Sequence, residues 1–380
     1  MKKLLPEVCT IQYGFPFDSA KFSDSNGTPL IRIRDVVRGY SETYTTEEYK
    51  SEYIVHENDL LIGMDGEFNI AKWGKTPALL NQRVCRLAPK DSIDKDYLFY
   101  FMPIALKRIE EKTPFVTVKH LSAKELNKIE IPVLSLEEQR KIAETLSKVD
   151  ELIAFREQQL AKLDELVKAR FVEMFGDLVA PQCEYPELKL VDICADADDI
   201  KCGPFGTQLN RDEYKAKGVA VWEIPQINSG FSEMPTHFIT EEKAVILNAY
   251  SIEPGDIAMS RKGNVGKCGL FPENLKKGII HSDVLRIRVD KRKVDSCFMM
   301  YQLHFSEAVK RQIEMVSSGA IMAGINVTKL KQIKVRIPEL ENQRMFAAFV
   351  ERVDQQKQRV QKSLEKLELM KKALMQEYFG

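Results

Sequence analysis

The sequence predicts an α+β fold in which two strand-rich domains are separated by a pair of long antiparallel coiled-coil helices, as an internal pseudo-two-fold repeat. Three observations predict it. Segments 137–176 and 341–380 align without a gap, with about fourteen of forty positions identical. Each copy has apolar residues at coiled-coil spacing, and each follows a region of short apolar runs separated by turn residues. The expected boundaries are 1–134, 135–176, 177–336 and 337–380.

The two regions upstream of these copies form a weaker repeat. Gly14 to Ser19 corresponds to Gly203 to Thr207, and the run that ends at Gly66 corresponds to the run that ends at Gly263. Runs of Val, Ile and Leu bounded by Gly, Pro and Asn predict strands. The predicted strands are 30–37, 59–64, 81–87, 219–224, 256–260 and 283–289, and the predicted domain helices are 96–111 and 297–316.

The repeated segments predict long helices that begin just after Pro132 and Pro338. Ser135 and Glu138 have the spacing of a capping box. About forty residues at 1.5 Å each span about 60 Å. We call the residues at coiled-coil spacing, which face the partner helix, the seam of each helix. The expected seams are Ile142, Leu146, Val149, Ile153, Arg156, Leu160, Leu163, Val167, Arg170 and Met174 in the first copy, and Phe346, Val350, Val353, Lys357, Val360, Leu364, Leu367, Lys371, Leu374 and Tyr378 in the second.

Each seam needs a partner. The simplest partner for the seam of one long helix is the seam of the other, with the two helices antiparallel. The alternative is that each helix packs only on its own domain. A seam that includes Arg and Lys can still be buried by one partner helix, because their aliphatic stems can pack while the charges reach water.

Composition indicates a folded, cytoplasmic protein. The chain has 380 residues and 44% hydrophobic content, and no apolar run is long enough to cross a membrane. Seven scattered cysteines without C-x-x-C spacing predict reduced, mostly buried thiols. The formal net charge is zero, so a nucleic-acid partner requires local positive charge or charge contributed by a partner subunit.

The sequence points away from catalysis, cofactors and metals. Gly74-Lys75-Thr76 lacks the preceding glycine of a phosphate-binding loop, because position 69 is Asn69. Gly266-Lys267 is followed by Cys268, where that loop needs Ser or Thr. The five histidines have no metal or catalytic-triad spacing.

The two helix starts carry a recognisable pattern. Ile131-Pro132-Val133-Leu134-Ser135-Leu136-Glu137-Glu138-Gln139-Arg140 and Ile337-Pro338-Glu339-Leu340-Glu341-Asn342-Gln343-Arg344 resemble the boundary that opens the conserved regions of type I restriction-modification specificity subunits. The second copy departs from the first at Asn342. The resemblance covers essentially the whole chain.

The resemblance implies a non-catalytic reader of double-stranded DNA. Two target-recognition domains each read half of a bipartite asymmetric site, and the helices set the spacer. Two DNA-adenine methyltransferase subunits dock on the helices, ATP-dependent restriction subunits join them, and no membrane is involved. The main rival interpretation is a coiled-coil scaffold that presents two protein-binding domains. A second rival, a solitary methyltransferase or nuclease with a recognition domain, would need a cofactor or metal motif, which the sequence does not show.

Candidate DNA contacts are basic, amide, hydroxyl and aromatic residues on the expected loops. In the first domain they are Gln12, Phe17, Ser19, Arg32, Arg34, Lys72, Trp73, Lys75, Gln82, Arg83, Thr117, Lys119 and His120. In the second they are Lys201, Phe205, Thr207, Gln208, Arg261, Lys262, Asn264, Lys267, Ser282, Ser318, Asn326 and Lys329.

Among these, the segment 261–267 is the strongest candidate, because three cations share a glycine-rich turn that can approach a DNA backbone closely. It could also be a solvated hairpin. Phe17, Phe205 and Trp73 could contact DNA or belong to the local core, and both possibilities stay open.

Overall fold

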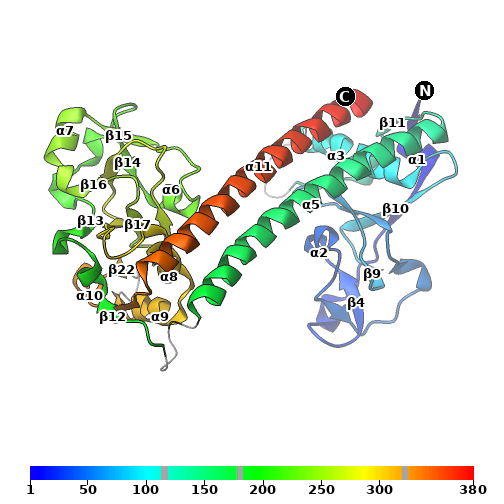
Figure 1. The fold of residues 1–380 in the computed structure, drawn as a ribbon. Coiled ribbons are helices and arrows are strands. Elements are labelled where there is room, and N and C mark those ends of the chain that lie inside the picture. Colours follow the sequence, from blue (N-terminus) through cyan, green and yellow to red (C-terminus); the bar gives the residue numbers. More distant parts are fainter. Residues whose placement is uncertain (113–118, 177, 179–182, 319–323) are drawn as a thin grey trace. The chain divides into compact units, whose positions relative to one another are not determined.

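The computed structural model describes residues 1–112, 119–176, 178, 183–318 and 324–380 (Figure 1). The chain divides into two compact units. Unit 1 consists of Met1–Gln158 and Gln361–Gly380, and unit 2 consists of Gln159–Val360. Each unit therefore contains one strand-rich domain, the beginning of the helix that follows it, and the end of the other long helix.

Unit 1 contains two main sheets. The first is antiparallel, in the order β2 (Cys9–Tyr13), β10 (Val84–Pro89), β7 (Leu60–Gly63) and β8 (Asn69–Lys72). The second has the order β3 (Phe22–Ser23), β5 (Tyr44–Thr45), β4 (Thr28–Ile31), β9 (Ala78–Leu80) and β6 (Ile54–Val55), with β4 and β9 parallel. Strands β1 (Lys2–Leu4) and β11 (Glu130–Pro132) pair separately, and the domain helices are α1 (Leu5–Val8), α2 (Ile33–Arg38), α3 (Lys95–Lys112) and α4 (Ala123–Leu126).

Unit 2 repeats this topology. Its antiparallel sheet has the order β13 (Ile200–Cys202), β20 (Val284–Ile287), β17 (Ile257–Ser260) and β18 (Cys268–Leu270). Its second sheet has the order β15 (His237–Ile239), β14 (Val219–Trp222), β19 (Gly278–Ile280) and β16 (Ser251–Ile252), with β14 and β19 parallel. The remaining elements are the pairs β12 (Glu187–Lys189) with β23 (Lys334–Arg336) and β21 (Ser317–Ser318) with β22 (Gly324–Ile325), and helices α6 (Ile224–Asn228), α7 (Glu241–Ile246), α8 (Ser296–Phe305), α9 (Glu307–Val316) and α10 (Val327–Leu330). The predicted internal repeat is confirmed.

The two long helices are α5 (Leu136–Phe175) and α11 (Leu340–Phe379), drawn in green and in orange to red in Figure 1. The capping box at Ser135 is confirmed, because its hydroxyl accepts the Glu138 backbone N–H at 3.3 Å and the Glu138 carboxylate accepts the Ser135 N–H at 3.0 Å. These bonds satisfy backbone donors that a helix start leaves free.

The helices run antiparallel in each unit. In unit 1 the carboxylate of Asp150 lies 2.6 Å from the Lys371 ammonium, and Arg156 Nε donates to Ser363 Oγ at 3.2 Å. In unit 2 the rings of Phe171 and Phe346 are 5.4 Å apart. Every predicted seam residue is buried or half-buried. The antiparallel pairing that the sequence favoured is therefore confirmed.

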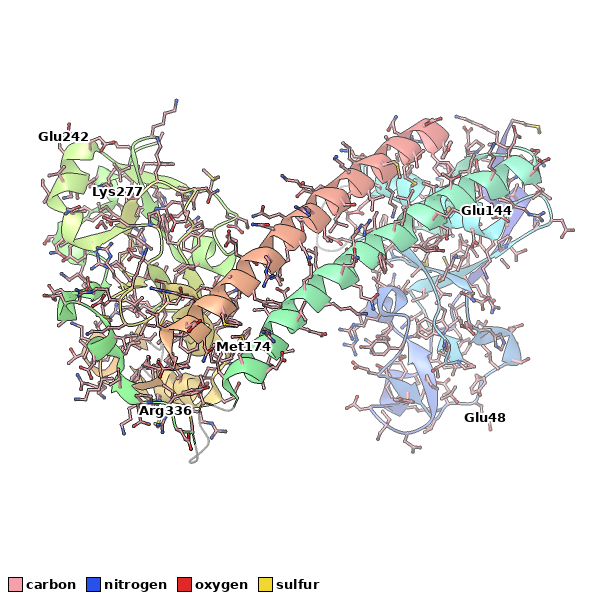
Figure 2. All side chains as sticks on the ribbon, in the orientation of Figure 1. Glu48, Glu144, Met174, Glu242, Lys277 and Arg336 are labelled. Carbon is pink, nitrogen blue, oxygen red and sulfur yellow. The ribbon has the colours of Figure 1, made fainter. Side chains whose placement is uncertain are left out.

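The end of each long helix packs on the domain that belongs to the other repeat. In unit 1, Phe379 of α11 contacts Tyr97 and Phe101 of α3, with ring centroids 5.2 and 5.8 Å apart. In unit 2, Phe175 of α5 contacts Phe298 of α8 at 4.8 Å; its neighbour Met174 is labelled in Figure 2. The phenylalanine of the repeated Phe-Gly is thus part of the core in both units.

The repeated glutamine of the helix-start pattern is fully buried in both copies. Gln139 Oε1 accepts the Asp94 N–H at 2.8 Å, and Gln343 Oε1 accepts the Asp295 N–H at 2.9 Å. The amide of Gln343 also donates to the Pro338 carbonyl at 2.7 Å. Asp295 caps α8, so each glutamine ties the start of a long helix to the start of the domain helix beside it.

Replacing Gln343 with Ala is expected to lower the free energy of unfolding by about 2–4 kcal/mol, because a buried N–H and a buried carbonyl lose their partner. Thermal and urea unfolding of the full chain measure this loss. The matched control is Gln355→Ala on the exposed face of the same helix, which should change stability by less than about 0.5 kcal/mol. Equal effects of the two variants would contradict the buried role of Gln343.

Three predicted elements are wrong in detail. The segment 219–224 was expected to be one strand, but β14 ends at Trp222 and α6 begins at Ile224. The segment 30–37 was expected to be one strand, but β4 ends at Ile31 and α2 begins at Ile33, where the Asp35 carboxylate accepts the Arg32 N–H at 2.8 Å and caps the helix. The segment 297–316 was expected to be one helix, but Ser306 has extended backbone angles and separates α8 from α9.

All seven cysteines are free thiols, of which Cys9, Cys85, Cys194 and Cys268 are buried. Burial raises the pKa of Cys85 and Cys268 to about 12, so these thiols stay protonated at neutral pH. Over the part of the chain that the structure describes, no helix is long and apolar enough to span a membrane.

Candidate DNA interface

The same three loops meet at one edge of the antiparallel sheet in each unit. In unit 1, Met64 N–H donates to the Arg83 carbonyl at 2.9 Å, and Leu121 N–H donates to the Met64 carbonyl at 2.7 Å. In unit 2, Arg261 N–H donates to the Asp283 carbonyl at 2.8 Å, and Ile325 N–H donates to the Arg261 carbonyl at 3.1 Å. Arg261 is therefore the structural equivalent of Met64. We call this meeting point of three loops the loop junction.

The loop junction of unit 1 gathers two of the predicted residues around a carboxylate. Asp65 Oδ2 lies 3.6 Å from Arg83 Nε, and Asp65 Oδ1 lies 2.5 Å from His120 Nδ1. The side chains of Arg83 and His120 are about half exposed, at 52% and 46%. Arg83 also has a positive φ of 71°, a conformation that non-glycine residues seldom adopt and that occurs often at functional sites.

The loop junction of unit 2 is more basic. Lys262 Nζ lies 2.8 Å from Asp283 Oδ1, and Arg261 Nε donates to the Ile325 carbonyl at 3.2 Å. The Arg261 guanidinium lies 4.9 Å from the centre of the Phe205 ring, which is 46% exposed. An exposed aromatic ring under a guanidinium favours a surface that can stack on or pack against a nucleic acid.

Further contacts join this junction to the first loop of the domain. Gln208 Oε1 accepts the Phe205 N–H and the Tyr250 hydroxyl, both at 3.1 Å. The Lys201 ammonium lies 5.7 Å from the Tyr250 ring centre and 2.9 Å from Asp198 Oδ2. Lys201, Phe205, Gln208, Arg261 and Lys262 are thus brought together as one connected surface.

Two predicted contacts are wrong because their side chains are buried. Phe17 is 3% exposed and packs with Leu30 and Leu79, and Trp73 is 2% exposed with its Nε1 donating to the Thr76 carbonyl at 2.7 Å. Neither ring can reach DNA without unfolding the local core. Phe205 differs from Phe17 because its ring stays at the surface.

Several other predicted residues bind groups of their own unit. Gln12 Nε2 donates to the Glu52 carbonyl at 2.8 Å, and Lys72 pairs with Asp96 at 2.8 Å. Lys119 donates to the Glu110 carbonyl at 2.7 Å, Lys267 donates to the Asn228 carbonyl at 2.9 Å, and the Asn326 side chain accepts the Lys329 N–H at 3.0 Å as the cap of α10.

The other predicted residues are not gathered into either junction by side-chain contacts. Ser19, Arg32, Arg34, Lys75, Gln82, Thr207, Asn264 and Lys329 are exposed, and Ser282 is half-buried beside Asp283. Thr117 and the side chain of Ser318 lie outside the described part of the molecule.

Sequence reasoning missed the role of the two junction carboxylates and an arginine in each unit, half-buried in unit 1 and buried in unit 2. Asp65 was not among the candidates, and Asp283 was named only beside Ser282 at the start of an expected strand, because the candidates were cations, amides, hydroxyls and aromatics. Arg86 and Arg286 occupy equivalent positions in β10 and β20 and join the two sheets: Arg86 Nη1 donates to the Ile54 carbonyl and Arg286 Nη1 to the Ser251 carbonyl, both at 2.8 Å. Burial lowers the pKa of Arg286.

The structure offers no obvious metal centre: within the described ranges, no group of three or more His, Cys, Asp or Glu side chains is placed to hold an ion. The two junctions instead present exposed donors and acceptors on loops, which suits recognition of a polar surface.

Comparison with known proteins decides the family. The chain matches the model of the type I restriction modification DNA specificity domain twice, at residues 1–165 and 199–369. The chain belongs to this family. It is a specificity subunit, the non-catalytic component of a type I restriction-modification complex, and it has two target-recognition domains. The rival interpretation as a protein-binding scaffold is set aside. DNA and the methylase and restriction subunits of such complexes are its class of partners.

The relatives agree with this assignment. The specificity subunit is 28% identical to the EcoBI specificity subunit of Escherichia coli, over 92% of this chain and 78% of the relative. It is 25% identical to the MjaVIII specificity subunit of Methanocaldococcus jannaschii, over 91% of this chain and 87% of the relative. The crystal structure of the S subunit from M. genitalium has the same fold, with a TM-score of 0.61 at 17% identity, covering 100% of this chain and 96% of the other.

Proposed function

We propose that each target-recognition domain reads one half of a bipartite, asymmetric site in double-stranded DNA. The observation that carries this proposal is the loop junction, which places exposed charged side chains at the same topological position in both units. Unit 1 contributes Arg83 and His120, and unit 2 contributes the surface from Lys201 to Lys262. Because the side chains of the two junctions differ, the two halves of the site differ in sequence.

The long helices are proposed to set the unread spacer and to bind two DNA-adenine methyltransferase subunits, which ATP-dependent restriction subunits join. Each helix is continuous over forty residues, and one end belongs to each unit. If a stiff pair of helices holds two DNA-reading surfaces a fixed distance apart, that distance determines the number of base pairs between the two half-sites.

Exposed apolar residues support methylase docking in both units. Unit 1 exposes Leu152, Phe155, Leu369 and Met370, and unit 2 exposes Leu166, Val172 and Met345. Leu166 and Met370 occupy equivalent positions of the repeat and are 45% and 43% exposed. Leu166 also lines a groove of about 560 Å³ between α5 and α11 in unit 2. Apolar residues exposed on a charged helix favour an interaction surface, and the one repeated pair, Leu166 and Met370, fits two docked subunits.

Selection of duplexes from a random library tests DNA reading directly. The purified complex with methylase is expected to enrich one bipartite sequence with a fixed gap, and its affinity should fall steeply between 50 and 200 mM salt as phosphate contacts are screened. The complex is the appropriate sample because the formal charge of this chain is zero. Enrichment of a single continuous site, or of none, would contradict the proposal.

A further inference from the structure

The two loop junctions contain the same ion pair with its charges exchanged. The backbone hydrogen bonds make Asp65 equivalent to Lys262 and Arg83 equivalent to Asp283. In unit 1 the carboxylate follows β7 and the cation precedes β10; in unit 2 the cation follows β17 and the carboxylate precedes β20. The backbone frame is thus common to both units, whereas the order of charges along it is opposite.

A second exchanged pair shows that the fold itself tolerates either order. At the β1–β11 pair, Lys2 lies 3.8 Å from Glu130, and at the equivalent β12–β23 pair, Glu187 lies 2.7 Å from Lys334. These strands pair backbone to backbone in both units whichever side is positive. The fold therefore does not determine which of the two positions at the loop junction carries the cation and which carries the carboxylate. The ligand of the junction can determine it.

The members of each junction pair remain accessible. The side chains of Arg83 and Lys262 are 52% and 38% exposed, and those of Asp65 and Asp283 are 23% and 26% exposed. Because the cation of each pair lies at the surface, water weakens the attraction within the pair. The cation can therefore exchange its internal contact for contacts with a ligand.

A cation beside a carboxylate complements the major-groove edge of a G·C base pair. Guanine presents the acceptors N7 and O6, which Arg and Lys bind, and cytosine presents the N4 amino donor, which Asp and Glu accept. An A·T pair fits less well in either orientation: the thymine methyl group and O4 face the carboxylate in one, and the adenine N7 acceptor faces it in the other. If the cation and the carboxylate exchange places on the same backbone, the pair complements C·G where it complemented G·C before.

We propose that the Asp65–Arg83 pair and the Lys262–Asp283 pair each read one G·C base pair, in opposite orientations relative to their own domains. This inference rests on the proposed function, in which each domain reads one half-site, and it assigns the residues that determine specificity at one position of each half. Arg83 and Lys262 bind guanine, and Asp65 and Asp283 bind the cytosine paired with it.

The test exchanges the charges of unit 1. A full-length variant with Asp65→Lys and Arg83→Asp is co-expressed with the methylase, and methylated adenines are mapped across a genome. One position of the first half-site should change from G·C to C·G, methylation of the parent site should fall about tenfold or more, and the second half-site should stay unchanged. The matched control, Lys2→Glu with Glu130→Lys, exchanges an ion pair of the same unit and should change neither half.

The reciprocal exchange, Lys262→Asp with Asp283→Lys, keeps the inference testable if the first variant does not assemble. It should reverse one G·C position of the second half only, with Glu187→Lys and Lys334→Glu as its control. A wild-type bipartite motif that both junction variants leave unchanged would overturn the inference and leave the proposed function standing. A wild-type complex without any bipartite motif would instead overturn the proposed function.

Discussion

Duplicating one heptad in both long helices is expected to lengthen the unread spacer by up to about three base pairs and to leave both half-sites unchanged. The duplicated segments are 152–158 of α5 and 354–360 of α11, which end at the boundary between the two units. Seven residues add about 10.5 Å of helix, and DNA rises 3.4 Å per base pair. A heptad also keeps the seam in phase on both helices. Mapping of methylated adenines measures the spacer.

The control inserts five residues at the same two places. Five residues rotate the downstream seam by about 140° and turn its apolar residues away from their partner. That variant should lose methylation altogether, because two continuous helices cannot keep the seam paired in both units when each is rotated between them. A heptad variant that methylates the parent spacer as efficiently as wild type would show that the helices do not set the distance.

Replacing Leu166 and Met370 with Lys together is expected to weaken methylase binding at least about 100-fold, since two buried ammonium groups without partners must be desolvated. Each single variant should retain one of two methylase subunits, because the residues occupy equivalent positions in different units. Both residues are exposed, at 45% and 43%, so the free energy of unfolding should change by less than about 0.5 kcal/mol. Light scattering of the purified complex gives the stoichiometry.

The matched control is Lys168→Glu with Lys372→Glu, two exposed residues that lie two positions further along each helix and point to another face. This variant reverses charge without touching the apolar surface, and it should keep both methylase subunits. Equal loss of binding in the two double variants would point to general electrostatic attraction in place of a specific apolar contact.

Sequence alone could predict the helices and the repeat because both depend on periodic patterns. The seam from Ile142 to Met174 repeats every seven residues, and the same pattern recurs 204 positions later. The short elements were harder, since their ends depend on single hydrogen bonds. The strand at Ile31 stops because Asp35 caps a following turn of helix, a local contact that the alternating pattern from Leu30 to Val37 does not reveal.

The candidate site was predicted in part. Arg261 and Lys262 could be chosen because cations on a glycine-rich turn are exposed wherever that turn lies. Phe17 and Trp73 could not be judged, because the burial of an aromatic ring depends on strands distant in the sequence. The role of Asp65 becomes visible only when Asp65 is recognised as the structural equivalent of Lys262. The alignment of Gly66 with Gly263 suggested this equivalence, and the backbone hydrogen bonds establish it.

The most direct test of the central claim is to map methylated adenines for the co-expressed complex, and for variants in which residues 1–134 or 177–336 are exchanged for the corresponding domain of another specificity subunit. The account predicts one bipartite motif with a fixed gap, in which the first exchange changes one half only and the second exchange changes the other half only. A motif in which either exchange alters both halves, or a folded complex that methylates no defined site, would contradict it.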